Sequence, residues 1–204
     1  MGVFAHWPNR ITALRFLGAL VLFVLLALWG EADLDTVRAQ PYLPAIAFWM
    51  FVLVAATDFL DGYLARRGNY VTAFGRIADP FVDKVLILGT LVLLGIAPWS
   101  REWLPGWMVV VILARELLVS AIRSYVEGEG GAFPADRWGK LKMVLQCIAV
   151  GALLWLPAYA WPPAWLAFWK HVATFFVWSA LIATVGSGVS YVLKTPQVLE
   201  ESRR

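Results

Sequence analysis

Six long apolar runs, separated by short polar segments, constrain this chain of 204 residues more than any other feature. A helix needs about 20 apolar residues to cross a bilayer. The composition agrees, because 61% of the residues are hydrophobic and 15% are charged, against about 45–50% and about 25% in soluble domains. We therefore expect an all-α integral membrane protein with six transmembrane helices in a single domain, residues 1–204. The predicted spans are residues 11–29, 42–63, 80–98, 104–124, 139–157 and 168–193.

The distribution of positive charge predicts how the chain is oriented. An even number of spans puts both termini on one side, and only three of the 17 Lys and Arg residues, Arg38, Arg101 and Lys170, then fall on the other. Because cytoplasmic segments carry the excess of positive charge, both termini should be cytoplasmic. We interpret the net charge of +3 as orientation and contact with anionic lipid, not as nucleic-acid binding.

Two other residue types carry less information. Cys147 is the single cysteine, which excludes a disulfide within the chain and a thiolate metal cluster. Many of the 12 tryptophans lie near the ends of the predicted spans, where aromatic residues form interfacial belts. We assign that role to Trp29, Trp99, Trp103, Trp107, Trp161 and Trp165.

Four aspartates surround the polar segment between the second and third spans. Asp58 and Asp61 are three residues apart, and Asp79 and Asp83 are four apart, so each pair shares one face of a helix. Two antiparallel helices can direct all four carboxylates to a common centre. Ionised carboxylates at membrane depth are costly unless they are paired or bind metal, and hard oxygen ligands favour Mg²⁺ or Mn²⁺ over Zn²⁺.

The residues between these aspartates suit a phosphate ligand. Gly62 and Gly75 leave room for a planar or phosphate group against the backbone, and Arg66 offers a guanidinium fork for phosphate oxygens. Together with the carboxylates they predict a site for phosphoryl transfer, in which catalysis consists largely of positioning and charge neutralisation.

The pattern Asp58-x2-Asp61-Gly62-x2-Ala65-Arg66-x8-Gly75-x3-Asp79-x3-Asp83 resembles the motif of the CDP-alcohol phosphotransferase family, with every fixed position present. The resemblance implies one or two Mg²⁺ ions, held mainly by Asp58, Asp61 and Asp79. It makes Asp83 a further ligand and the general base, so that an acceptor hydroxyl attacks the lipid-bearing phosphate and releases CMP. Residues implied to shape the CDP pocket are Gly62, Ala65, Arg66 and Gly75.

Further segments resemble the bacterial phosphatidylglycerophosphate synthases within that family. They are Pro8-Asn9 with Thr12 and Arg15, Thr57, Ala114-Arg115-Glu116-Leu117 with Ser120 and Arg123, and Gly139-Lys140-x-Lys142 with Gln146. This resemblance implies CDP-diacylglycerol and glycerol 3-phosphate as substrates, a bacterial inner membrane with a cytoplasmic active site, and a homodimer. It adds Asn9 and Thr57 to the CDP-binding residues.

The basic residues of the fourth and fifth spans support an anionic acceptor. Arg115 and Arg123 are eight residues apart and share a helix face, and a cation as deep as Arg115 is usually functional. With Lys140 and Lys142 they could hold a phosphate dianion. Two simpler interpretations stay open: Arg115 could pair with Glu116, and the lysines could be cytoplasmic anchors.

Two alternative functions follow from the same residues. A sister transferase that uses inositol phosphate or phosphatidylglycerol would also carry the aspartate motif, and inositol phosphate would need the basic pocket. A divalent-cation transporter would also need intramembrane carboxylates, but all four aspartates lie at one membrane face.

Overall fold

The structure is a computed structural model that describes residues 7–40, 42–68, 73–131, 133 and 137–202. Side chains are described for residues 9–40, 42–57, 78–131, 133 and 138–200. All regular structure in these residues is helical, as the all-α prediction requires. The helices are α1 (Trp7–Ala27), α2 (Leu34–Ala39), α3 (Leu43–Gly68), α4 (Ala73–Ile96), α5 (Gly106–Gly128), α6 (Arg137–Ala158) and α7 (Pro163–Ser202).

Each predicted span lies on a separate long helix: α1, α3, α4, α5, α6 or α7. Within the described residues, three segments are long and apolar enough to cross a membrane, Asn9–Ala27, Trp138–Ala158 and Pro163–Glu200. The apolar part of α3 that is described, Leu43–Thr57, is shorter. The helices α4 and α5 are interrupted by several charged residues, among them Asp83, Lys84, Arg115 and Glu116. The structure thus has six long helices, three of which have the composition of a span.

The polar segment between the second and third spans is shorter than the sequence suggests. Residues 65–79 were predicted as a polar stretch, yet α3 continues to Gly68 and α4 begins at Ala73. Alanine and arginine are strong helix formers, so a polar sequence at a helix end does not stop the helix. Asp79 therefore lies inside α4, and Pro80 follows it within the same helix.

The short helix α2 was not predicted. Asp33 is its N-cap, and the Asp33 Oδ1 atom accepts a hydrogen bond from the Thr36 backbone N–H at 2.8 Å. This hydrogen bond lowers the pKa of Asp33 below its ordinary value. Val37 is fully buried, and Arg38 donates to the Trp161 carbonyl at 3.1 Å. The burial of Val37, the packing of Leu34 against the core and these two hydrogen bonds thus hold a helix too short for a periodic sequence signal.

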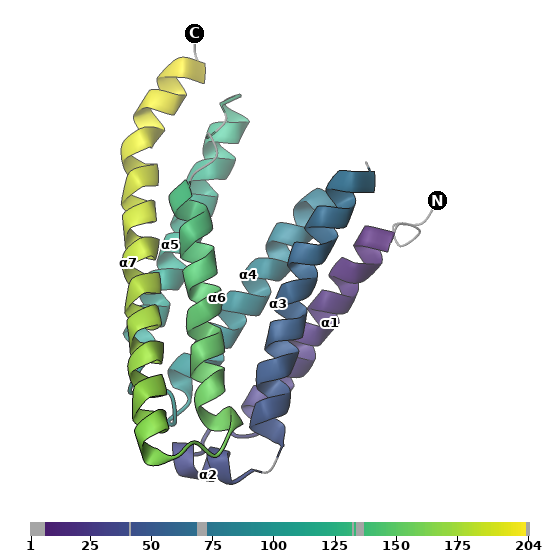
Figure 1. The fold of residues 1–204 in the computed structure, drawn as a ribbon. Helices are drawn as coiled ribbons and strands as arrows, with labels where there is room; N and C mark the ends of the chain where they lie inside the picture. The colour runs from purple at the N-terminus through teal and green to yellow at the C-terminus, as the bar shows by residue number, and fades with distance from the viewer. Residues whose placement is uncertain (1–6, 41, 69–72, 132, 134–136, 203–204) are drawn as a thin grey trace.

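The long helices form a bundle whose two ends differ (Figure 1). The helix α1 packs against α3 and α4, α7 packs against α5 and α6, and α3 contacts α6. The start of α1 and the end of α7 lie at the same end of the bundle, as an even number of crossings predicts, and α2 lies at the other end. We call the first the terminal end and the second the α2 end.

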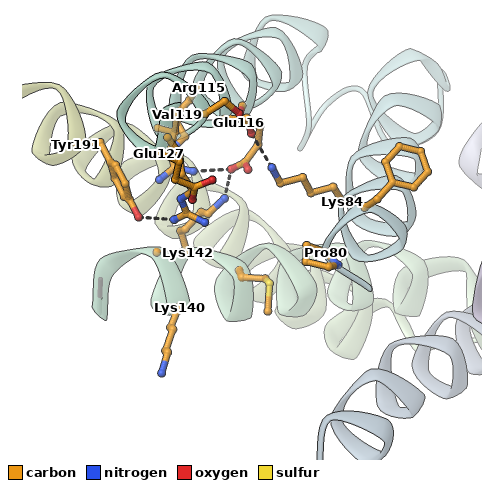
Figure 2. A pocket seen from close by; sticks show the side chains of 15 residues that line it. Pro80, Lys84, Arg115, Glu116, Val119, Glu127, Lys140, Lys142 and Tyr191 are labelled. Atoms are coloured by element: carbon orange, nitrogen blue, oxygen red, sulfur yellow. Dashed lines mark hydrogen bonds and ion pairs between the residues drawn. The ribbon is translucent and has the colours of Figure 1, made fainter. Parts of the chain in front are cut away.

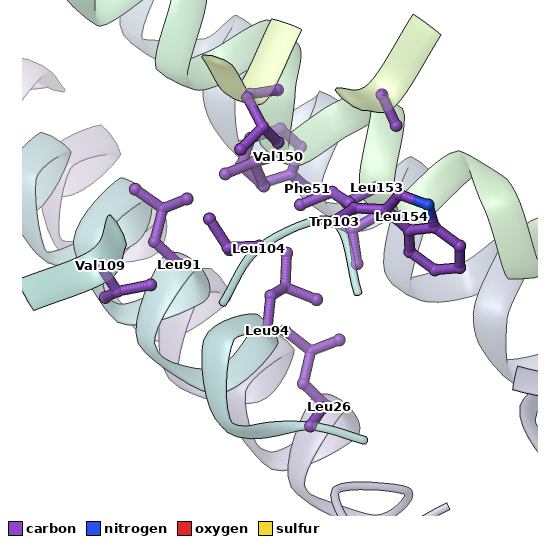
Figure 3. Close-up of a cluster of buried hydrophobic side chains, with 14 of the residues drawn as sticks. Leu26, Phe51, Leu91, Leu94, Trp103, Leu104, Val109, Val150, Leu153 and Leu154 are labelled. Atoms are coloured by element: carbon purple, nitrogen blue, oxygen red, sulfur yellow. The ribbon is translucent and has the colours of Figure 1, made fainter. Parts of the chain in front are cut away.

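The apolar core reaches α2, which contributes Val37, and Figure 3 shows part of the core. Its side chains come from all seven described helices and from the turns before α2 and α5. The core includes Leu26, Phe51, Leu91, Leu94, Trp103, Leu104, Val109, Val150, Leu153 and Leu154.

The tryptophans near the span ends differ in burial, and Trp161 is half-buried. Trp107 and Trp165 are 53% and 57% exposed, as interfacial residues would be. The prediction is wrong for Trp29, Trp99 and Trp103, which are at most 7% exposed and belong to the core. Position near a span end does not distinguish a ring that faces lipid from one that packs between helices.

Candidate active site

Two carboxylates of α4 are held by side chains of α1. Asp79 accepts a hydrogen bond from the Thr12 hydroxyl at 2.5 Å, and Asp83 accepts one from the Arg15 guanidinium at 2.6 Å. Thr12 and Arg15 are at most 3% exposed. Because Asp79 and Asp83 are one turn apart, α1 orients both on the same face of α4.

Several predicted site residues lie outside the described side chains. Asp58, Asp61, Gly62, Ala65 and Arg66 belong to α3, whose backbone is described there. Gly75 belongs to the first turn of α4. Within the described side chains, no group of three or more His, Cys, Asp and Glu residues could hold a metal ion. The roles predicted for these residues stay predictions.

Asn9 and Thr57, the two other residues predicted to bind CDP, differ in their surroundings. Asn9 is buried at 2% exposure near the start of α1. The Thr57 hydroxyl donates to the Val54 carbonyl of its own helix at 2.7 Å. A hydroxyl bonded in this way still has acceptor lone pairs for a ligand.

A cavity of about 640 Å³ lies between α4, α5, α6 and α7 near the terminal end of the bundle (Figure 2). All four residues predicted to bind the acceptor phosphate line it, and one further lysine joins them. Its cationic residues are Lys84, Arg115, Arg123, Lys140 and Lys142. Two acidic residues, Glu116 and Glu127, also line the cavity, so five cations and two anions leave a net charge of +3. We call this space the basic cavity.

Arg115 and Lys142 share one carboxylate in the wall of the basic cavity. Glu116 accepts a hydrogen bond from Arg115 at 2.8 Å and another from the Lys142 ammonium. Arg115 also donates to the Ser187 hydroxyl of α7 at 2.8 Å. All four residues are at most 9% exposed. The pairing of Arg115 with Glu116, left open by the sequence, is present and extends to α6 and α7.

Glycine at position 188 allows α7 to approach this cluster. A Cβ atom at Gly188 would lie 2.9 Å from the Arg115 Cγ atom, so any larger residue would displace that side chain. At Gly186, by contrast, a Cβ atom would meet nothing within 4 Å. The close approach of α7 to this cluster therefore depends on Gly188 and not on Gly186.

Arg123 is positioned by an aromatic residue that sequence reasoning missed. It donates to the Tyr191 hydroxyl of α7 at 2.6 Å, and its guanidinium carbon lies 5.7 Å from the Tyr191 ring centroid. Arg115 approaches the same ring at 5.8 Å. Tyr191 lies 76 residues from Arg115 along the chain, and no local pattern signals such a contact.

The two lysines of α6 differ. Lys142 is buried and directed toward Glu116, whereas Lys140 is exposed and directed away from it (Figure 2). Lys140 therefore belongs to the lining of the basic cavity without joining the hydrogen-bonded cluster.

Lys84 is the second functional candidate that sequence reasoning missed. Its ammonium donates to the Ser120 hydroxyl of α5 at 2.6 Å. A cation four residues into the predicted span 80–98, directly after Asp83, is a signal that could have found it, because intramembrane cations are rare.

A second cavity of about 210 Å³ adjoins the first and contains the α4 carboxylates. Asp79 and Asp83 line it together with Gln146, whose amide donates to the Thr184 hydroxyl at 2.9 Å. We call it the carboxylate cavity. Residues that line both cavities are Pro80, Lys84, Glu116, Lys142 and Met143. An anion in the basic cavity would thus lie next to a group held near Asp79 and Asp83.

Comparison with known proteins defines the class to which this site belongs. The family model for CDP-alcohol phosphatidyltransferase matches residues 5–186. The chain belongs to the CDP-alcohol phosphatidyltransferase family and is accordingly a transferase.

Relatives within the family align over most of the chain. A CDP-diacylglycerol–glycerol-3-phosphate 3-phosphatidyltransferase of Bacillus subtilis is 36% identical over 203 residues, covering 96% of this chain and 97% of that protein. The Haemophilus influenzae enzyme of the same name is 31% identical over 151 residues, 73% of this chain and 76% of that protein. A probable phosphatidylglycerophosphate synthase of Mycobacterium tuberculosis is 34% identical over 194 residues, 93% of this chain and 81% of that protein.

Proposed function

We propose that this protein transfers the phosphatidyl group of CDP-diacylglycerol to glycerol 3-phosphate, giving phosphatidylglycerophosphate and CMP. The observation that carries the proposal is the basic cavity next to the carboxylate cavity. The names of the relatives from B. subtilis and H. influenzae state the same donor and acceptor. In this proposal, residues 1–204 form a single catalytic domain.

The basic cavity suits an acceptor that carries a phosphate dianion. Its net charge of +3 favours an anion, and the arginine guanidinium presents paired N–H groups to phosphate oxygens. We propose that Arg115, Arg123 and Lys142 bind the acceptor phosphate and that Lys140 contributes at longer range. An uncharged acceptor would not offset the net charge of +3 in the basic cavity, which disfavours glycerol or a neutral alcohol.

The chemistry of the α4 carboxylates fits a divalent cation. Asp79 and Asp83 supply hard oxygen donors of the kind that Mg²⁺ and Mn²⁺ prefer, and α1 holds both side chains in fixed orientations. We propose that Asp58, Asp61, Asp79 and Asp83 together hold one or two such ions. When bound, a divalent cation would offset the negative charge of the diphosphate.

In the proposed reaction, Asp83 accepts the proton of the acceptor hydroxyl. A bond forms between that hydroxyl oxygen and the phosphorus atom that bears the lipid, and the bond from this phosphorus to the oxygen of CMP breaks. Arg15 donates to one carboxylate oxygen of Asp83 and fixes the plane of the group. A general base positioned in this way raises the reaction rate about 10²–10⁴-fold.

We place the donor nucleotide on the side of Asp79 and Asp83 that faces away from the basic cavity. We propose that Gly62, Ala65, Arg66 and Gly75 form the CDP pocket, with Asn9 and Thr57 at its edge. The resemblance of the motif supports this assignment, and so does the position of Asn9 and Thr12 on one helix that also reaches Asp79.

We propose a bacterial inner membrane as the location, with six spans and with both termini and the active site in the cytoplasm. The predominance of Lys and Arg at the terminal end supports this orientation. We also propose that the protein is a homodimer, which rests on the family resemblance.

An acceptor panel tests the proposed function. Purified protein with CDP-diacylglycerol and Mg²⁺ is supplied separately with glycerol 3-phosphate, inositol phosphate, phosphatidylglycerol or glycerol, and CMP release is measured. We expect release with glycerol 3-phosphate alone. Release with inositol phosphate or phosphatidylglycerol would keep the reaction and replace the acceptor. No release with any acceptor would contradict the proposal and leave ion transport to be assayed in vesicles.

A further inference from the structure

Lys84 lies at the boundary between the two cavities. Among the described side chains, three charged residues line both of them, namely Lys84, Glu116 and Lys142. Glu116 and Lys142 are paired with each other. In the part of the chain whose side chains are described, Lys84 pairs with no carboxylate.

The contact with Ser120 directs the Lys84 ammonium across the boundary. Ser120 donates its own hydroxyl hydrogen to the Glu116 carbonyl at 2.7 Å, so its oxygen accepts from Lys84 at 2.6 Å. An ammonium has three N–H donors, and Ser120 uses one. Lys84 is exposed to the cavity space (Figure 2), so the remaining donors can reach a ligand.

The proposed reaction brings two anions together at this boundary. The acceptor carries a phosphate in the basic cavity, and the donor diphosphate lies near Asp79 and Asp83. Attack requires the acceptor hydroxyl to approach a phosphorus atom surrounded by negatively charged oxygens. A fixed cation that faces this point lowers the energy of the transition state more than that of either bound reactant.

We infer that Lys84 is a catalytic residue whose ammonium contacts the phosphoryl oxygens of the group in transfer. This inference rests on the proposed function. Lys84 exchanges no proton in the step: the acceptor oxygen bonds to phosphorus, the bond to CMP breaks, and Asp83 takes the proton. Its role differs from that of Arg115 and Arg123, which bind the acceptor phosphate in the ground state and the transition state alike.

Steady-state kinetics of Lys84→Ala separate these roles. We expect kcat to fall about 100-fold, the effect of losing one preorganised charge contact in a transition state, while KM for glycerol 3-phosphate changes less than about threefold. Ethylammonium in the assay buffer should restore part of kcat, which a purely structural defect would not allow. Lys194→Ala is the matched control, because Lys194 is an exposed lysine of α7 that lines neither cavity.

Other results would overturn the inference. A higher KM with unchanged kcat would make Lys84 an acceptor-binding residue, and wild-type kinetics would remove it from the reaction. If Lys84→Ala does not purify as a folded protein, Lys84→Gln carries the same test.

Transfer assays on the wild-type protein distinguish a failure of this inference from a failure of the proposed function. If it uses a different acceptor, the variants are measured with that acceptor. A wild type that transfers to no acceptor overturns the proposed function and the role of Lys84 with it. A wild type that transfers normally beside equally active Lys84 variants overturns only the role of Lys84.

Discussion

The two ends of the bundle are built from different interactions. Toward the terminal end, helices are joined by polar contacts such as Arg115–Ser187 and Arg123–Tyr191. Toward the α2 end, they are joined by aromatic rings around Trp155, whose ring centroid lies 4.7–5.8 Å from its neighbours. Those neighbours are Phe48, Tyr159, Trp161 and Trp169.

We infer from this difference that the terminal end serves mainly catalysis and the α2 end mainly stability. Charged and polar residues between helices offer hydrogen-bond partners to a polar ligand, whereas packed rings bury apolar surface and contact one another. Changes at the terminal end should therefore alter catalysis first, and changes at the α2 end should alter stability first.

The largest expected effect is that of Asp83→Asn on transfer. Asparagine keeps the shape of the side chain and an oxygen that can accept from Arg15, but it cannot take a proton. We expect kcat to fall by about 10²–10⁴-fold, together with a lower melting temperature, because the buried Arg15 guanidinium loses the charge of its ion-pair partner. CMP release and thermal unfolding in detergent measure the two quantities. A variant that retains more than a tenth of the activity would exclude Asp83 as the base.

Glu116→Gln should affect both activity and stability. It leaves the buried cations of Arg115 and Lys142 without their shared carboxylate, a change that costs about 3 kcal/mol of unfolding free energy. We expect a lower melting temperature and a KM for glycerol 3-phosphate about tenfold higher, which corresponds to about 1.4 kcal/mol.

A double variant checks the cause of this loss. Adding Lys142→Met to Glu116→Gln removes one of the two cations that lose the shared carboxylate, so the double variant should melt at a higher temperature than Glu116→Gln. Lys142→Met is also measured alone. If the loss of stability in the double variant equals the sum of the losses in Glu116→Gln and Lys142→Met, the three side chains do not form one electrostatic unit.

Trp155→Leu tests the other end of the bundle. The substitution removes the four ring contacts and should lower the free energy of unfolding by about 2 kcal/mol. We expect kcat and KM at 25 °C to stay at wild-type values, because the site lies at the opposite end. A changed KM for glycerol 3-phosphate would contradict the separation of the two ends.

Arg123→Lys should have a smaller effect. Lysine keeps the charge but cannot contact both the Tyr191 hydroxyl and a phosphate with a planar fork. We expect KM for glycerol 3-phosphate to rise about fivefold, below the tenfold that corresponds to 1.4 kcal/mol, with kcat unchanged. Tyr191→Phe removes only the hydroxyl and serves as the matched control, with a weaker effect in the same direction. If Tyr191→Phe raised KM more than Arg123→Lys, the packing of Tyr191 and not the Arg123 guanidinium would determine acceptor binding.

The smallest effect is expected from Asp33→Ala, which removes the N-cap of α2. The pKa of Asp33 is lowered below 3.8 in the folded protein, so its stabilising contribution is present at higher pH and is lost as pH falls through the lowered value. The small difference in melting temperature between variant and wild type should therefore stay constant between pH 5 and pH 8 in detergent. A difference that changes over this range would contradict the assigned hydrogen bond.

The sequence predicts the parts of the fold that depend on local pattern. Apolar length located six helices, and helical spacing put Asp79 and Asp83 on one face of α4. The pair Arg115–Glu116 was also within reach, because adjacent opposite charges in an apolar span have few other partners.

What the sequence does not predict depends on contacts between distant segments. Tyr191 and Ser187 position arginines 68 and 72 residues away, and no spacing in the chain encodes this. Lys84 was missed because it follows the aspartate motif directly and is not part of it. The third span was predicted to begin at residue 80, but α4 begins at Ala73. Polar residues at a helix end resemble a loop when only the sequence is known.

The most direct test of the central claim is the fate of isotopically labelled glycerol 3-phosphate. Purified protein is incubated with CDP-diacylglycerol, Mg²⁺ and ¹³C-labelled glycerol 3-phosphate, and lipid and nucleotide products are analysed by mass spectrometry. The proposed function predicts labelled phosphatidylglycerophosphate and CMP in equal amounts, both formed at least about 100-fold more slowly with Asp83→Asn. CMP without labelled lipid, or labelled lipid made equally well by Asp83→Asn, would contradict it.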